Sequence, residues 1–248
     1  MADAQGGTGI EPGAASDIPD GPASPAAPTP VPLAGRHLWW EVAAVLAVGV
    51  VPNAMAAVSH LCDPLPALPY WLDSLNLSVL SGCTIFVTLY LIGRSGEPWE
   101  RFGVVRPSLW DVVFGGIFFV AAVLLWIFVP SFLWSEGGVR RYPFPTPHGT
   151  ADHAMMVVKY GLSAFAEEIV TRAYLITRLT DLLRSRAEAV VMSAILFASY
   201  HAYQGAPGVA YTFAFGLVYG TGFLLIRRIW PLALGHALYN IRIELLVA

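Results

Sequence analysis

Residues 152–178, DHAMMVVKYGLSAFAEEIVTRAYLITR, form an apolar run long enough to cross a bilayer, yet two adjacent carboxylates, Glu167 and Glu168, lie deep within it. A spanning helix needs about 20 predominantly apolar residues. A charge near the bilayer centre costs roughly 2.5–3.5 kcal/mol on insertion scales, so such residues usually face a bundle interior and mark function. This stretch therefore predicts a membrane helix bundle that encloses Glu167 and Glu168.

The composition of the whole chain agrees with a multi-pass membrane protein. Of 248 residues, 56% are hydrophobic and only 12% are charged, with a mean hydropathy of +0.61. A soluble domain typically carries about 25% charged residues. The net charge of −3, with a single lysine, excludes a nucleic-acid binder. Cys62 and Cys83 provide neither a disulfide framework nor a cysteine-based metal motif.

Apolar runs organise the chain into an all-α, polytopic transmembrane bundle of about seven spans with a disordered N-terminal tail. The tail, residues 1–35, holds seven of the 19 prolines and no apolar periodicity. Residues 36–109 are expected to form N-terminal transmembrane helices with a connecting loop, and residues 110–248 a second membrane domain. The seven runs are residues 39–60, 70–93, 110–134, 152–178, 187–203, 207–226 and 229–247.

The arginines predict the orientation of this bundle. Nine flank one side of the predicted spans, and three flank the other. By the positive-inside rule, the N-terminus is expected in the cytoplasm and the C-terminus outside. The nine are Arg36, Arg94, Arg101, Arg106, Arg178, Arg184, Arg186, Arg227 and Arg228, and the three are Arg140, Arg141 and Arg242.

Helix geometry separates the two glutamates. Adjacent residues on an α-helix point about 100° apart, while residues spaced i, i+4 share a face. Glu168 and Arg172 have that spacing and predict a structural ion pair. Glu167 is then a free carboxylate, with Thr171 and Tyr174 expected on its own face. The alternative is a purely structural triad that holds helices together.

Two later runs contain polar residues that bear on this choice. The segment FASYH, residues 197–201, places Phe197 and His201 on one helix face, and HALYN, residues 236–240, does the same for His236 and Asn240. At 1.5 Å per residue from the predicted cytoplasmic ends, Glu167, both histidines and Asn240 lie ~10–20 Å deep. These side chains are therefore expected to meet in one buried layer.

A carboxylate, two histidines and an asparagine suit a hydrolytic site. Glu167 is the candidate general base on a water molecule, and His201 could orient that water. His236 and Asn240 could donate hydrogen bonds to an oxyanion. Alternatively, Glu167, His201 and His236 could bind a divalent metal such as zinc, because His₂Glu is a catalytic zinc ligand set. The sequence leaves the presence of a metal open.

The ordered motifs EEIVTR, FASYH and HALYN resemble those of the CPBP family of intramembrane proteases. That family includes the type II CAAX prenyl endopeptidases and the Abi, or bacteriocin-processing, proteins. Its pattern, E-E-x-x-x-R, F-x-x-x-H and H-x-x-x-N, is matched between residues 167 and 240 without a departure. WERFGVVRPS, residues 99–108, is also similar to the family's lead-in segment. The resemblance extends over about 110–247 and identifies residues 110–248 as the CPBP domain.

The resemblance implies an endopeptidase that cuts peptides or membrane proteins within or beside the lipid bilayer. It assigns water activation to Glu167 and His201 and the oxyanion hole to His236 and Asn240. Glu168 and Arg172 are supporting, as is Phe197 of the second motif. The family is described both as metalloproteases and as metal-independent glutamate proteases.

Two other functions stay open. Some family members act as membrane scaffolds, immunity factors or maturation helpers, so the chain could be a catalytically silent protein of the same fold. A proton-coupled transporter is the third alternative, because buried glutamate and histidine also serve proton relays. Prenylated CAAX proteins, leader peptides and membrane-protein fragments are all compatible substrates.

Overall fold

The computed structural model describes residues 35–62, 68–131 and 145–247, and every regular element in these ranges is a helix. The expected all-α class is therefore confirmed for this part of the chain. The expected tail, residues 1–35, lies outside it except for Gly35, where the first helix begins. The loop that contains Arg140 and Arg141 also lies outside the described residues.

Each apolar run corresponds to one or more helices. In chain order these are α1 (Gly35–Gly49), α2 (Val51–Cys62), α3 (Tyr70–Arg94), a 3₁₀ turn (Trp99–Phe102), α4 (Leu109–Ser131), α5 (Gly149–Glu168), a π-helical segment (Ile169–Ile176), α6 (Thr177–Leu183), α7 (Arg186–Ser199), a 3₁₀ turn (Ala202–Gln204), α8 (Gly205–Ile226) and α9 (Trp230–Val247). Helix α7 starts where its sequence contains a capping signal, because the Ser185 hydroxyl accepts a hydrogen bond from the Glu188 backbone N–H.

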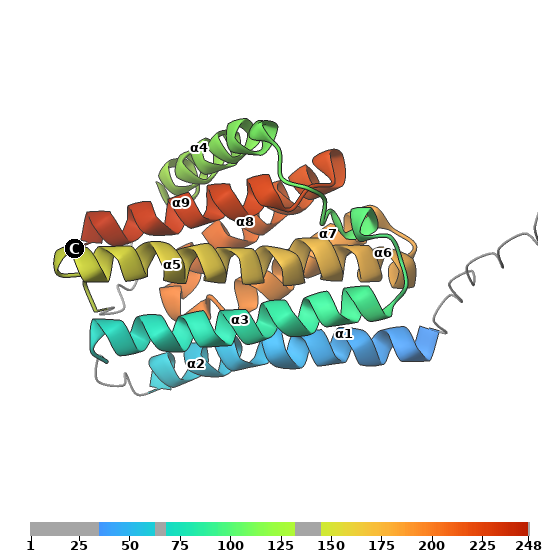
Figure 1. Ribbon diagram of the computed structural model, residues 1–248, viewed down its shortest axis with the longest axis horizontal. Coiled ribbons are helices and arrows are strands. Elements are labelled where there is room, and N and C mark those ends of the chain that lie inside the picture. The colour runs from blue at the N-terminus through green and yellow to red at the C-terminus, as the bar shows by residue number, and fades with distance from the viewer. Residues whose placement is uncertain (1–34, 63–67, 132–144, 248) are drawn as a thin grey trace, which may run out of the picture. The chain divides into compact units, whose positions relative to one another are not determined.

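Helix α5 lies between α3 and α9 (Figure 1). Helix α1 packs on α3, α4 packs on α9 and α8, and α7 packs on α8. Where α7 meets α8, a Cβ at Gly216 would come within 2.9 Å of the Ala194 backbone. Small residues allow such close approach of two helices.

The sequence contains seven apolar runs, but fewer of the described helices are long and apolar enough to cross a membrane. Among the described helices, three are long and apolar enough to cross a membrane, namely Tyr70–Arg94, Leu109–Val129 and Ala202–Ile226. The first apolar run is broken after Gly49 into α1 and α2, which bend by 42° and could together form a fourth span. Helix α7 has only 14 residues, short of the length that a bilayer requires. The expected count of seven spans stays a prediction.

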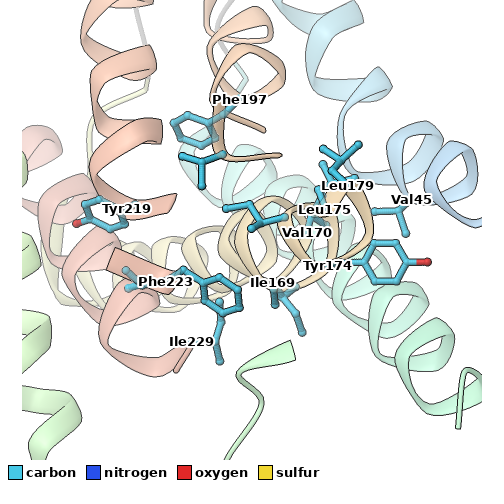
Figure 2. Packing of buried hydrophobic residues seen from close by; sticks show 14 of the residues in the cluster. Val45, Ile169, Val170, Tyr174, Leu175, Leu179, Phe197, Tyr219, Phe223 and Ile229 are labelled. Carbon is cyan, nitrogen blue, oxygen red and sulfur yellow. The ribbon is translucent and has the colours of Figure 1, made fainter. Parts of the chain in front are cut away.

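The π-helical segment lies at the centre of the packed core. All eight of its residues are buried, which matches a helix that is covered on every side. Figure 2 shows Ile169, Val170, Tyr174 and Leu175 projecting from different sides of this segment into the hydrophobic cluster. Within the EEIVTR motif, Glu168 therefore ends α5 and the residues after it lie in the buried core.

Candidate functional site

Glu168, at the end of α5, joins the first motif to the third. Its Oε1 lies 2.8 Å from Nδ1 of His236 in α9, and its Oε2 lies 3.2 Å from Nε of Arg172. All three residues are buried, and Glu168 has no exposed surface. The ion pair expected from the i, i+4 spacing is present. The contact with His236 was not expected, because the two residues are far apart in the sequence.

Glu167 lies beside the same histidine as Glu168, but next to its other ring nitrogen. Its Oε2 is buried without a hydrogen-bond partner and lies 3.8 Å from Nε2 of His236. The glutamate borders a cavity of about 20 Å³ between α1, α2, α3 and α5, which is large enough for one water molecule. The other lining residues are Gly49, Asn53, Leu77, Leu80, Ser81, Thr84, Ser163 and Ala166.

Two hydroxyl groups satisfy backbone carbonyls where the helix widens. The Thr171 hydroxyl donates to the Glu167 carbonyl at 2.5 Å, and the Ser193 hydroxyl of α7 donates to the Thr171 carbonyl at 2.6 Å. Arg172 also donates to the Thr171 hydroxyl. π-Helical turns occur frequently at functional sites. Tyr174, expected on the face of Glu167, instead donates its hydroxyl to Glu41 in α1, since the wider turn changes the angular spacing of residues.

Arg172 lies among aromatic rings. Its guanidinium carbon is 4.3 Å from the ring centroid of Phe197 in α7, 5.7 Å from that of Phe215 and 5.8 Å from that of Tyr219. Aromatic faces attract a cation most strongly where water is excluded. Phe197 was expected as a supporting residue. The sequence reasoning missed Phe215 and Tyr219 of α8, although their i, i+4 spacing is visible in the sequence.

His201 and Asn240 are half-buried. The His201 Nδ1 atom is 2.8 Å from the Phe197 carbonyl, and its ring packs against Phe197 with centroids 4.8 Å apart. Asn240 follows His236 by one turn of α9. Among the polar contacts of the described residues, none joins His201 or Asn240 to Glu167. The structure thus brings Glu167, Glu168, Arg172 and His236 together, with His201 and Asn240 outside this contact set.

The expected zinc ligands, Glu167, His201 and His236, do not converge on one point. A zinc site needs several donors at about 2.0–2.3 Å from a common centre. Within the described ranges, no group of three or more histidine, cysteine, aspartate or glutamate residues is placed to hold a metal ion. These residues, as arranged, do not fit a metal.

A second buried charge cluster, which the sequence reasoning did not identify, joins α3, α5 and α9. The Nζ of Lys159 lies 3.1 Å from Oε2 of Glu244 and 3.5 Å from Oδ2 of Asp73. The hydroxyls of Tyr70 and Tyr160 also donate to Glu244. Lys159 is only 2% exposed. The only lysine of the chain therefore belongs to a buried network rather than to a surface.

Residues 150–242 match the family model of the Rce1-like type II CAAX prenyl endopeptidases. No curated protein and no solved structure matches the chain. The matched range contains all three motifs, but not the cavity-lining residues of α1, α2 and α3. It also lies within residues 110–248, whose boundaries as a domain stay a prediction. Residues 150–242 thus match the Rce1-like, type II CAAX prenyl endopeptidases, and this match supports the CPBP family that the three motifs indicate.

Proposed function

We propose that this membrane protein is an intramembrane endopeptidase in which Glu167 activates the attacking water. The observation that carries the proposal is Glu167 itself, a residue whose buried Oε2 has no hydrogen-bond partner and which lines a cavity with room for one water. An unsatisfied buried carboxylate oxygen is costly, so such an atom requires an explanation. A water substrate at this position explains it.

The proposed reaction begins with proton transfer to Glu167. As the water oxygen forms a bond to the carbonyl carbon of the scissile peptide, Glu167 accepts one of its protons. The carbonyl oxygen then carries the negative charge of a tetrahedral intermediate. When the C–N bond breaks, the same proton passes to the leaving amine, which restores the carboxylate. The products are a carboxylic acid and an amine.

The contact with Glu168 determines which ring nitrogen of His236 carries a proton and which one can face an oxyanion. Because a carboxylate only accepts hydrogen bonds, the Nδ1 of His236 must carry the proton in this contact. The Nε2 of a neutral His236 is then an acceptor. Donation from Nε2 to an oxyanion therefore requires the imidazolium form, which the buried Glu168 carboxylate stabilises in the way that a triad aspartate does.

His201 and Asn240 have proposed roles that need a small rearrangement when substrate binds. The Nδ1 of His201 donates to the Phe197 carbonyl, so a neutral His201 keeps a lone pair on Nε2 with which to orient the water. Asn240 is proposed as the second oxyanion donor. Catalytic hydrogen bonds are often long in enzymes without substrate and shorten in the reactive complex.

Substrate class and topology complete the proposal. The family match supports a peptide or membrane-protein substrate that reaches the site from the lipid bilayer. The excess of arginine on one side supports a multi-pass chain with its N-terminus in the cytoplasm.

The test is cleavage of a peptide substrate by protein reconstituted in liposomes, with Glu167→Gln compared with the parent. This change keeps the shape of the side chain and removes the base, so cleavage should disappear while the protein stays folded. Glu188→Gln, at an exposed position of α7, is the matched control and should cleave at the parent rate. Cleavage by Glu167→Gln at the parent rate contradicts the mechanism.

A catalytically silent scaffold, immunity factor or maturation factor is the second candidate. The observation that favours it is the size of the cavity beside Glu167, which admits a water but not a peptide. Complementation separates the two candidates. If Glu167→Gln restores the function of a strain that lacks the gene as fully as the parent does, the scaffold is correct. If it fails while the parent succeeds, the protease is supported.

A further inference from the structure

A second cavity, of about 170 Å³, lies at the end of the bundle that carries most of the arginines. Three arginines line it, namely Arg101, Arg186 and Arg227, together with Asp181. Arg227 directly follows Ile226, the last residue of the apolar helix at Ala202–Ile226. The cavity thus lies where an apolar span ends, at the level expected for lipid headgroups.

The charges that line this cavity are not balanced. Arg101 is paired, because its Nη2 lies 2.5 Å from Oδ1 of Asp181 and its other amino group pairs with Glu97. Arg186 and Arg227 have no carboxylate partner among the described residues. Three guanidinium groups and one carboxylate leave a net charge of +2 on the lining. The neighbouring Arg228, by contrast, is paired with Asp111 at 2.6 Å.

Arg227 is held in position by its backbone. It caps α8 in the left-handed conformation, with φ at 50°, and its N–H donates to the Phe223 carbonyl at 2.8 Å. Its guanidinium carbon lies 5.4 Å from the centroid of the Phe223 ring. Burial lowers the pKa of Arg227, and the charges of Arg186 and Arg101 lower it further. A bound anion would offset both the loss of hydration of Arg227 and its repulsion by the other two arginines.

We propose that this cavity binds the phosphate group of an anionic phospholipid. Guanidinium groups bind phosphate through paired, charge-assisted hydrogen bonds. Basic pockets between membrane helices bind lipid headgroups on the cytoplasmic side. The apolar surface beside the cavity favours a lipid over a free ion, because Leu224 lines the cavity and the adjacent Leu225 is 78% exposed. An acyl chain can lie along α8 while its phosphate contacts Arg227.

The experiment uses the full chain purified in detergent and titrated with phosphatidylglycerol, phosphatidylcholine or inorganic phosphate. Lipid adducts are counted by native mass spectrometry. Phosphatidylglycerol should bind in preference to phosphatidylcholine, and Arg227→Gln should weaken its binding about 10- to 100-fold, the loss expected for a charged hydrogen bond. Arg186→Gln removes an exposed and unpaired side chain, so it tests the cavity without endangering the fold.

Arg184→Gln is the matched control. Arg184 also caps a helix in the left-handed conformation, with φ at 58°, but it is exposed and does not line the cavity. It should leave lipid binding unchanged. An equal loss in Arg184→Gln, or no preference of the parent for phosphatidylglycerol, overturns the site. If inorganic phosphate alone displaces the lipid at equal concentration, the anion site is supported but its proposed lipid source is overturned.

Discussion

The Nδ1 atom of His236 in α9 lies 2.8 Å from the Oε1 atom of Glu168 in α5, while the other oxygen of this carboxylate pairs with Arg172. One fully buried carboxylate therefore serves a histidine and an arginine at once. The second glutamate of EEIVTR fixes the orientation of His236, which leaves the first glutamate, Glu167, next to the other ring nitrogen. In the proposed mechanism, the second glutamate therefore positions His236 and the first glutamate accepts the proton.

Replacement of Glu168 by Gln should abolish most of the activity even though Glu167 remains. The amide no longer stabilises the imidazolium form of His236, and loss of the equivalent carboxylate in a serine protease triad costs about 10⁴-fold in kcat. By this analogy we expect kcat to fall by about 10²- to 10⁴-fold, while KM changes little. Steady-state cleavage in liposomes measures both constants.

Stability provides the control for this variant. Glu168→Gln also leaves Arg172 buried without its partner, at a cost of about 3–5 kcal/mol. The double variant Glu168→Gln/Arg172→Met removes both charges and should regain much of the lost thermal stability, yet stay inactive. Recovery of cleavage along with stability would mean that Glu168 acts only through Arg172, and not through His236.

Ser193→Ala should disturb the π-helical segment. The Ser193 hydroxyl is the donor to the Thr171 carbonyl, and both residues are buried. Its loss removes this hydrogen bond between α7 and the π-helical segment and should cost about 0.5–1.5 kcal/mol. A change of 1 kcal/mol shifts the unfolding midpoint of a chain of this size by about 2–4 °C. Cleavage should also slow, because Thr171 in turn bonds the backbone of Glu167.

Ser199→Ala is the companion measurement for this prediction. Ser199 lies on the same helix but is exposed, and its hydroxyl donates only to the Leu196 carbonyl within α7. Differential scanning fluorimetry of both variants should show a lower midpoint for Ser193→Ala alone. Equal midpoints would rule out a special role for the contact between α7 and the π-helical segment.

Part of the site could be predicted from local spacing. The Glu168–Arg172 pair follows from i, i+4 geometry, and the apolar runs locate the helices to within a few residues at most ends. Motif order indicated the family whose model matches residues 150–242. Each of these features depends either on residues within one helix or on the order of residue types along the chain.

Tertiary contacts between distant segments could not be predicted in this way. The partners Glu168 and His236 are 68 residues apart, and Lys159 in α5 forms an ion pair with Glu244 in α9. The widening of the helix at Ile169–Ile176 has no compositional signal, since the same residues suit an α-helix. The bend between α1 and α2 could not be predicted either, because both helices lie within one continuous apolar run.

Phe197→Leu should destabilise the protein through Arg172. The ring of Phe197 lies 4.3 Å from the guanidinium carbon and is 2% exposed. A desolvated cation–π contact is worth about 2 kcal/mol or more, and leucine keeps most of the apolar volume. The unfolding midpoint should therefore fall clearly. Phe86→Leu, on the exposed face of α3 at 71% exposure, should leave it unchanged. Similar shifts in the two variants would mean that ring volume, rather than the contact with Arg172, decides stability.

Lys159→Met should weaken the junction of α3, α5 and α9. The change leaves Glu244 buried without its cation, and breaking a buried ion pair costs about 3–5 kcal/mol. Adding Glu244→Gln removes the second charge, so the double variant should be more stable than Lys159→Met alone. Lys159 precedes Glu167 by eight residues, or ~12 Å along an α-helix, so the folded double variant should still cleave substrate. Thermal unfolding and cleavage assays on the same preparations test both statements. Additive losses of stability would show that Lys159 and Glu244 do not interact energetically, and loss of cleavage in the folded double variant would connect this cluster to the site at Glu167.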